Sequence, residues 1–268
     1  MVITFLYSLA GGMLVVLATA RVEQISWRFL RLMGLLIFAL TAAATAWSFG
    51  EGRFENALLR WWVNGLGVAL GVGAAASVFF APFAATRPGV FRTVCLVSGL
   101  TGLCVATLCA IGRTGQIPLQ GVALGMVVAS QVLGALLLGS ITIAWLLGHA
   151  YLTATKMTLA PLRHFSRLLL WAVIVRAAFP LFSLGVAWMI GAGGDPSVIS
   201  HMGQAWLVLV LRVGVGLVGV GVFAYMVADC VRLRATQSAT GILYFGSIFA
   251  YIGELASQQL ITDCGWPL

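Results

Sequence analysis

The chain has 268 residues, of which 61% are hydrophobic and only 8% are charged, and its mean hydropathy is +1.06. This composition excludes a soluble globular domain, since such domains use about 25% charged residues. A net charge of +8 suggests nucleic-acid binding in a soluble protein, but here the basic residues lie in short segments between apolar runs. We therefore expect the lipid bilayer as a partner, and no nucleic acid.

Eight apolar runs follow one another along the chain with short connections between them. About 20 helical residues cover the ~30 Å hydrocarbon layer of a bilayer, and each run is close to that length. The sequence therefore predicts an all-α, polytopic membrane helix bundle in one domain, residues 1–268. The predicted spans are residues 2–20, 29–49, 61–84, 93–112, 121–148, 168–192, 204–228 and 240–262.

Basic residues distinguish the two sides of this bundle. The first, third, fifth and seventh connections hold ten Lys and Arg residues, whereas the other connections hold three. The positive-inside rule then places the odd connections in the cytoplasm and both termini on the outer, periplasmic side. The nine Trp residues lie at or near predicted span ends, as is typical of interfacial aromatic belts. We expect a multi-pass protein of the inner (cytoplasmic) membrane.

The two halves of the chain resemble each other weakly, which suggests a 4+4 parallel repeat. Phe29-Leu30-Arg31-Leu32 opens the second span and Phe165-Ser166-Arg167-Leu168 opens the sixth. The third and seventh spans are both rich in Gly, although chance is an alternative explanation in a chain with 32 Gly. Because small residues let helices approach closely, we expect these two spans at the bundle centre. The residues concerned are Gly65, Gly67, Gly71 and Gly73, and Gly214, Gly216, Gly219 and Gly221.

Three charged residues, Arg176, Arg212 and Glu254, lie well inside predicted spans. An Arg at the centre of a membrane helix costs about 2.5–3.5 kcal/mol on insertion scales, so each of these residues requires a partner. Arg212 and Glu254 each lie eight residues from the outer ends of their spans, at a matching depth of about 12 Å. We expect them to pair, either as a structural salt bridge or as part of a functional site.

The last predicted span carries a polar stripe. Tyr244, Ser247, Tyr251, Glu254 and Gln258 recur at spacings of three and four residues, which places them on one helix face. Such a stripe is compatible with a proton path in which Glu254 titrates, or with the wall of a polar cavity. Hydrogen bonds that merely hold helices together are the third interpretation.

Arg176 is followed four residues later by Pro180, which has no N–H to bond to the carbonyl of Arg176. This predicts a polar pocket in the cytoplasmic half, suited to an anion, a quinone oxygen, a haem propionate or a lipid phosphate. The alternative is that Arg176 extends towards the cytoplasmic headgroups. His149 and Tyr151, at the end of the fifth span, are further candidates for binding a quinone or lipid headgroup.

The sequence offers little for metal or covalent catalysis. Haem ligation through His149 is disfavoured, because the one nearby histidine, His164, is flanked by Arg163 and Arg167. The five Cys residues are dispersed without a C-x-x-C pair, and no hydrolase or zinc motif occurs. We expect no metal site, no catalytic residue and no independent enzymatic activity, with a quinone or bound lipid as the candidate cofactor.

Two functions are compatible with this pattern. The first is an integral membrane subunit of a larger respiratory or photosynthetic electron-transfer complex, with a scaffold, quinone- or lipid-binding, or proton-conducting role. It is favoured by the small extramembrane part and by one excess positive charge within the membrane, which a ligand or another subunit would balance. The alternative is a small proton-coupled secondary transporter that uses Glu254.

Overall fold

The computed structural model describes residues 1–50, 57–112, 121–153, 159–189, 205–264 and 266–267. All of its helices lie within the first five of these ranges. These ranges contain no strand. Between α8 and α9 lies a π-helical segment, η4 (Leu211–Gly219), and the three form one continuous span. The α-helices are α1 (Val2–Ala18), α2 (Trp27–Gly50), α3 (Ala57–Phe80), α4 (Pro88–Ile111), α5 (Val122–Thr153), α6 (Ala160–Met189), α8 (Trp206–Val210), α9 (Val220–Arg232) and α10 (Thr236–Cys264).

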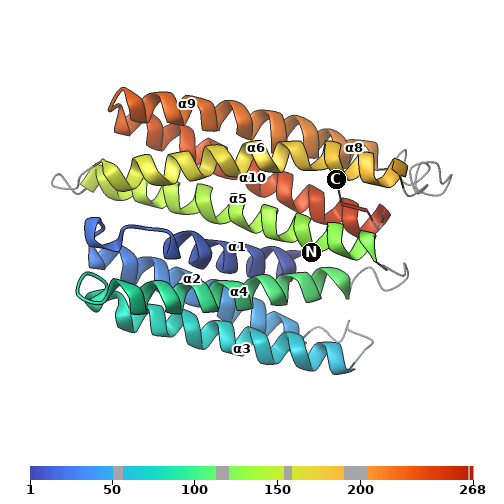
Figure 1. Ribbon diagram of the computed structural model, residues 1–268, viewed down its shortest axis with the longest axis horizontal. Coiled ribbons are helices and arrows are strands. Elements are labelled where there is room, and N and C mark those ends of the chain that lie inside the picture. Colours follow the sequence, from blue (N-terminus) through green and yellow to red (C-terminus); the bar gives the residue numbers. More distant parts are fainter. Residues whose placement is uncertain (51–56, 113–120, 154–158, 190–204, 265, 268) are drawn as a thin grey trace.

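Seven helical spans in the described chain are long and apolar enough to cross a membrane. They are α2, α3 with the short helix η2 (Ala81–Phe83), α4, α5, α6, the continuous α8–η4–α9 and α10. The 17-residue α1 is also apolar but shorter, and it lies beside the others (Figure 1). The predicted all-helical, polytopic membrane fold is thus confirmed at this level.

Helix boundaries agree with the predicted spans within a few residues, with one larger difference. Helix α6 begins at Ala160, eight residues before the predicted span at residue 168. The predicted boundaries at residues 192 and 204 lie outside the described residues. The early start of α6 brings Arg163, His164 and Arg167 into a helix instead of a connection.

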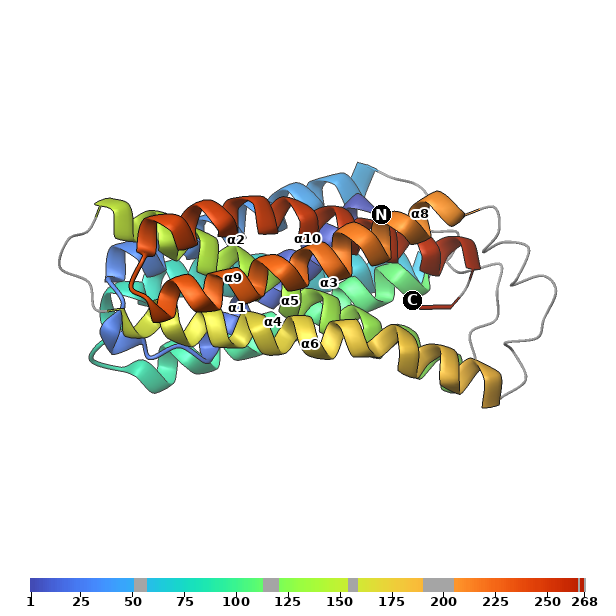
Figure 2. The same cartoon turned by 90° about the horizontal axis from the view of Figure 1, so that it is seen from above.

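The helices form two four-helix units that lie side by side (Figure 1). In the first unit α1, α2, α3 and α4 pack as a ring, each against the next, and α4 closes the ring on α1. In the second unit α5, α6, α9 and α10 pack in the same cyclic order. Contact between the units is made chiefly by α1 against α5. Seen after a quarter turn, all the long helices run along one common axis (Figure 2).

Glycine content did not identify the central helices. The Gly-rich α3 and the span Trp206–Arg232 are among the least buried, so the expectation that they form the bundle centre is wrong. A Cβ added at Gly65 or Gly214 would meet open space, which shows that these glycines make no close helix contact. The centre is instead formed where Gly12 of α1 meets α5, because a Cβ at Gly12 would collide with the carbonyl oxygen of Ala135.

Both termini lie towards the same end of the bundle (Figure 1). Among the described basic residues near helix ends, only Arg60 belongs to that end, whereas nine arginines lie at the opposite end. Lys156, Arg53 and Arg113, which also entered the charge argument, lie outside the described residues. The nine arginines are Arg21, Arg28, Arg31, Arg87, Arg92, Arg163, Arg167, Arg232 and Arg234.

The contact between the two units can be tested at Gly12. We predict that Gly12→Ala lowers the free energy of unfolding by about 1–3 kcal/mol, because the added methyl group overpacks the α1–α5 contact. Gly65→Ala is the matched control, since its methyl group enters open space and Ala favours helix by about 1 kcal/mol. Unfolding in mixed micelles, followed by Trp fluorescence, measures both. Equal effects of the two substitutions would contradict the close contact.

Candidate functional site

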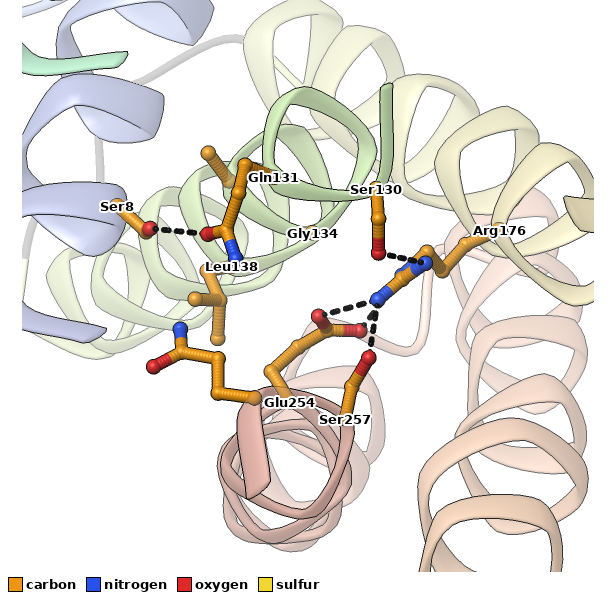
Figure 3. Close-up of a pocket in the computed structure, with 10 residues that line it drawn as sticks. Ser8, Ser130, Gln131, Gly134, Leu138, Arg176, Glu254 and Ser257 are labelled. Atoms are coloured by element: carbon orange, nitrogen blue, oxygen red, sulfur yellow. Dashed lines mark hydrogen bonds and ion pairs between the residues drawn. The ribbon is translucent and has the colours of Figure 1, made fainter. Parts of the chain in front are cut away.

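The three buried charged residues meet in one cluster. Glu254 of α10 accepts two hydrogen bonds from Arg176 of α6, from Nε to Oε1 and from Nη2 to Oε2, both at 2.9 Å. Nη1 of Arg212, in η4, donates to Oε1 of the same carboxylate at 2.9 Å. The expected pairing of Arg212 with Glu254 is therefore present. Arg176 is a second partner of Glu254 and binds both carboxylate oxygens; Figure 3 shows Arg176 beside Glu254.

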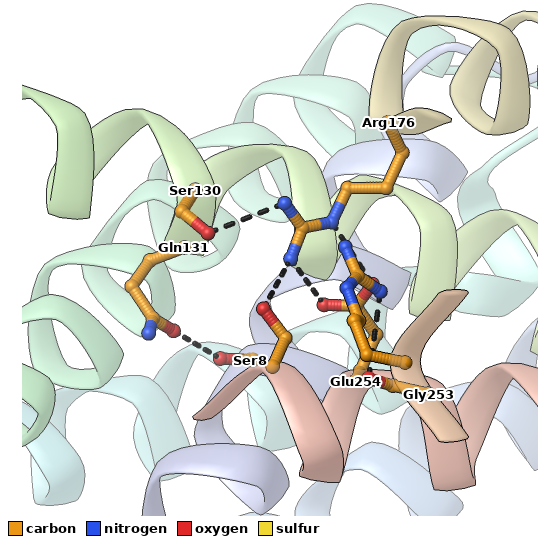
Figure 4. Close-up of polar contacts among 8 residues, drawn as sticks. Ser8, Ser130, Gln131, Arg176, Gly253 and Glu254 are labelled. Atoms are coloured by element: carbon orange, nitrogen blue, oxygen red, sulfur yellow. Dashed lines mark hydrogen bonds and ion pairs between the residues drawn. The ribbon is translucent and has the colours of Figure 1, made fainter. Parts of the chain in front are cut away.

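Serine and carbonyl oxygens accept further hydrogen bonds from the two guanidinium groups. Arg176 donates from Nη1 to Oγ of Ser130 at 3.2 Å (Figure 4). It also donates from Nη2 to Oγ of Ser257 at 2.9 Å (Figure 3). Nη1 of Arg212 lies 3.4 Å from the carbonyl oxygen of Gly253. Because Ser130 belongs to α5, the cluster connects all four helices of the second unit.

The cluster is withdrawn from solvent and lipid. The exposed fractions of Arg176, Arg212 and Glu254 are 1%, 0% and 3%. In such a medium an unpaired ion is strongly destabilising, whereas a bidentate, hydrogen-bonded pair offsets much of its desolvation. Two guanidinium groups and one carboxylate leave a formal charge of +1, which the serine and carbonyl dipoles spread but do not cancel.

Close helix contacts at glycine residues make this geometry accessible. Gly216 of η4 and Gly253 of α10 touch backbone to backbone, so that a Cβ on either would collide with the other. Gly216 lies one turn after Arg212, and Gly253 directly precedes Glu254. On the α5 side, a Cβ at Gly134 would collide with Oε2 of Glu254. Larger residues at these positions would push the charged groups apart.

The depth expected for Arg176 differs from the observed one. From the sequence we expect this residue in the cytoplasmic half, with its relation to Arg212 and Glu254 open, but all three lie at one level. The reason is the early start of α6 at Ala160, which puts Arg176 near the middle of a 30-residue helix. Its guanidinium group lies 5.7 Å from the ring centroid of Phe179 and is buried, so it does not extend to the headgroups.

The polar stripe of α10 is only partly a connected feature. The hydroxyl groups of Tyr251 and Thr142 lie 2.9 Å apart, joining α10 to α5, while Ser247 donates to the carbonyl oxygen of Tyr244 in its own helix. Tyr244 is 53% exposed, and its ring packs edge-on against Trp145. Within the ranges that the structure describes, no hydrogen bond links Tyr251 to Glu254.

A closed polar region beside the cluster joins the two units (Figure 3). Ser8 of α1 donates to Oε1 of Gln131 in α5 at 3.4 Å, and Gln258 of α10 lines the same region. Oε1 of Gln258 is buried and has no hydrogen-bond partner among the described residues. The space between these groups does not admit a water molecule.

Four polar residues of this region, Ser8, Ser130, Gln131 and Ser257, were not identified from the sequence. Ser257 could have been found, because it lies three residues after Glu254 and so shares its helix face. Ser130 and Gln131 form a polar pair in the middle of an apolar span, which is a usable signal for an interhelical contact. Nothing in the sequence distinguishes Ser8 from the other small polar residues of its span.

His149 and Tyr151 lie at the other end of the second unit from the C-terminus and are not brought together with Arg176. Along α5, the 15 residues from Gly134, which borders the cluster, to His149 correspond to about 22 Å. His149 is exposed, and the side chain of Tyr151 interacts with the backbone of Leu162 at the start of α6. In the described part of the chain, no group of three or more His, Cys, Asp or Glu residues could hold a metal ion.

Comparisons with known proteins give no relative for this chain. No protein-family model, no curated protein sequence and no solved structure matches it.

The cluster makes a direct prediction for stability. Glu254→Gln leaves two buried guanidinium groups without their counter-charge, so we expect the free energy of unfolding to fall by about 3–5 kcal/mol. Asp263→Asn is the control in the same helix, because that carboxylate is only partly buried and accepts from Gln259 within one turn. We expect it to change stability by less than about 1 kcal/mol. Micellar unfolding compares the two variants, and a near-native Glu254→Gln protein would rule out the cluster as described.

Proposed function

We propose that this chain is an integral membrane subunit of a larger respiratory or photosynthetic electron-transfer assembly, in which it serves as a helical scaffold without catalysis of its own. The observation that carries the proposal is the closure of the Arg176–Glu254–Arg212 cluster. Protein groups surround it, and they leave no space for water or a substrate. A site that binds a small molecule usually offers about 300–1,000 Å³.

The excess positive charge of the cluster supports the scaffold role, although not through a balancing ligand or subunit as the sequence suggested. A carboxylate from another subunit cannot reach Arg176 or Arg212, since both are fully buried within the second unit. The charged groups instead hold the four surrounding helices together, because moving any of these helices away would expose an ion to hydrocarbon. This supports a rigid second unit on which other subunits assemble.

Quinone handling within such an assembly has a candidate place in the first unit. An apolar groove of about 410 Å³ between α2 and α3 includes Gly67 and Gly71, and a second cavity of about 500 Å³ adjoins it at Phe49 and Val68. Arg60 lines the second cavity, at the helix end. The groove suits an isoprenoid tail, and the guanidinium group suits a quinone oxygen.

We also propose the membrane orientation that the charges favour. The end with nine described arginines faces the cytoplasm, α1 is an eighth span, and both termini face the periplasm across an inner membrane. The common cyclic order of helix contacts in the two units supports a 4+4 parallel duplication.

Gentle purification tests the subunit proposal. We expect other membrane chains and a quinone to copurify, and we expect Val68→Trp to lower quinone retention at least about tenfold by filling the groove. Val218→Trp is the control, because Val218 is similarly exposed but lies on η4, away from the groove. Mass spectrometry of chains and extracted quinones provides the measurement. A stable monomer without quinone or partner chains would contradict the proposal.

A proton-coupled transporter is the second candidate, and one observation favours it. Arg212 lies in a nine-residue π-helical segment, and such segments occur frequently at functional sites. Transporters also place interrupted helices at their central binding sites. In this function one of the ion pairs to Glu254 would have to open for a proton to bind.

Proton flux distinguishes the two candidates. For a scaffold, we expect proteoliposomes containing the wild type or Glu254→Gln to hold an imposed pH gradient equally well, because the closed cluster offers no path. A pH-sensitive dye trapped inside the vesicles follows the gradient. Dissipation by the wild type that is lost in Glu254→Gln but retained in Asp263→Asn would favour the transporter.

A further inference from the structure

A basic cavity lies at the arginine-rich end of the bundle, far from the buried cluster. It has a volume of about 240 Å³ and is formed by the connection after α1 and the first two turns of α6. Its floor contains the buried side chains of Ile25 and Phe165. Its rim carries three exposed arginines, Arg21, Arg163 and Arg167.

No acidic residue in the described part of the chain pairs with the arginines of this cavity. At the same end, Arg92 lies 3.7 Å from Glu23, and Arg232 lies 2.6 Å from Asp229. These are the acidic residues described at that end. No carboxylate lines the cavity, and no ion pair joins Arg21, Arg163 or Arg167 to another described residue. Three guanidinium groups therefore converge on one cavity without a counter-charge.

The backbone around the cavity is held in place by its neighbours. Nε of Arg92 donates to the carbonyl oxygen of Ala20 at 3.2 Å, which fixes the connection after α1 to α4. Nε2 of His164 lies 3.3 Å from Oγ1 of Thr19, which ties the start of α6 to the end of α1. The cavity is thus bounded by two anchored segments from different units of the bundle. A ligand bound here would join the two units where the connection after α1 meets the start of α6.

We infer that this cavity binds the phosphate group of an anionic phospholipid. Guanidinium groups bind phosphate oxygens through paired, charge-assisted hydrogen bonds, and three of them fit a phosphate better than a neutral headgroup. Basic pockets between membrane helices on the cytoplasmic side are suited to anionic headgroups. The apolar floor provides a surface for the first methylene groups of the lipid. The inference concerns a separate site and does not depend on the proposed electron-transfer role.

An anionic phospholipid and free inorganic phosphate would both present a phosphate group to the three arginines. Native mass spectrometry of the detergent-purified full chain distinguishes these sources, with phosphatidylglycerol, phosphatidylcholine and inorganic phosphate as separate probes. The test variant is Arg163→Gln/Arg167→Gln. The control is Arg31→Gln/Arg87→Gln, which removes the same charge at the same end but lies outside the cavity. Thermal unfolding verifies that both variants fold.

We expect the wild type to retain phosphatidylglycerol at least about tenfold better than phosphatidylcholine. The test variant should bind phosphatidylglycerol about 30-fold more weakly, and the control should resemble the wild type. Arg163→Lys/Arg167→Lys should recover much of the binding. Tight binding of inorganic phosphate that displaces the lipid would assign the same site to a free anion. Equal losses in test and control variants, or equal binding of both lipids, would overturn the inference.

Discussion

A carboxylate shared by two guanidinium groups in a low-dielectric interior is the constraint on which the second half of this protein depends. Glu254 is held by Arg176 on both oxygens and by Arg212 on one, at 2.9 Å in each case. Withdrawing Glu254 would leave two buried guanidinium groups without a counter-charge, and withdrawing either arginine with its helix would place that cation unpaired in hydrocarbon. The helices that carry these residues therefore cannot separate without a large loss of free energy. Glycine residues let these groups come within hydrogen-bond distance. Gly216 of η4 contacts Gly253 of α10, and Gly134 of α5 leaves room for the carboxylate of Glu254.

The two four-helix units therefore differ in how they are held together. In the first unit, the described side-chain bonds between α1, α2 and α3 are neutral, as between the hydroxyl groups of Tyr7 and Thr45 at 3.0 Å and from Ser48 to Asn64 at 2.7 Å. Its one described ion pair, between Arg92 and Glu23, lies at the arginine-rich end and is partly exposed. Neutral bonds of this kind contribute little in membranes, about 0.6 kcal/mol on average, so packing dominates there. The apolar groove and the exposed faces of α2 and α3 belong to this first unit. The second unit is thus held by a buried ionic cluster, whereas the first has an apolar groove between α2 and α3.

The sequence predicted the helices and one of the two ion pairs for identifiable physical reasons. Apolar length defines membrane spans well, and equal depth on consecutive antiparallel helices predicted the contact of Arg212 with Glu254. Arg176 was misplaced because the segment from Ala160 to Arg167 is basic and resembles a connection, although it is the first part of α6. Helix rotation is set by packing, so the composition of the Gly-rich spans could not show that Gly65 and Gly214 face open space whereas Gly216 contacts another helix. Nor could it show that Gly12 lies at the centre. For the same reason the sequence alone did not bring Ser8 and Gln131 together.

The central claim is that Arg176 and Glu254 are energetically coupled inside the membrane, and a double-mutant cycle measures this coupling directly. The free energies of unfolding of the wild type, Arg176→Met, Glu254→Met and the double variant give the interaction energy. The structure predicts a coupling of at least about 2 kcal/mol, with the double variant less destabilised than the sum of the single ones. The reason is that Glu254→Met alone leaves two unpaired guanidinium groups, whereas the double variant leaves one. Additivity within about 0.5 kcal/mol would show that the two residues do not interact in the folded protein, and would contradict the account.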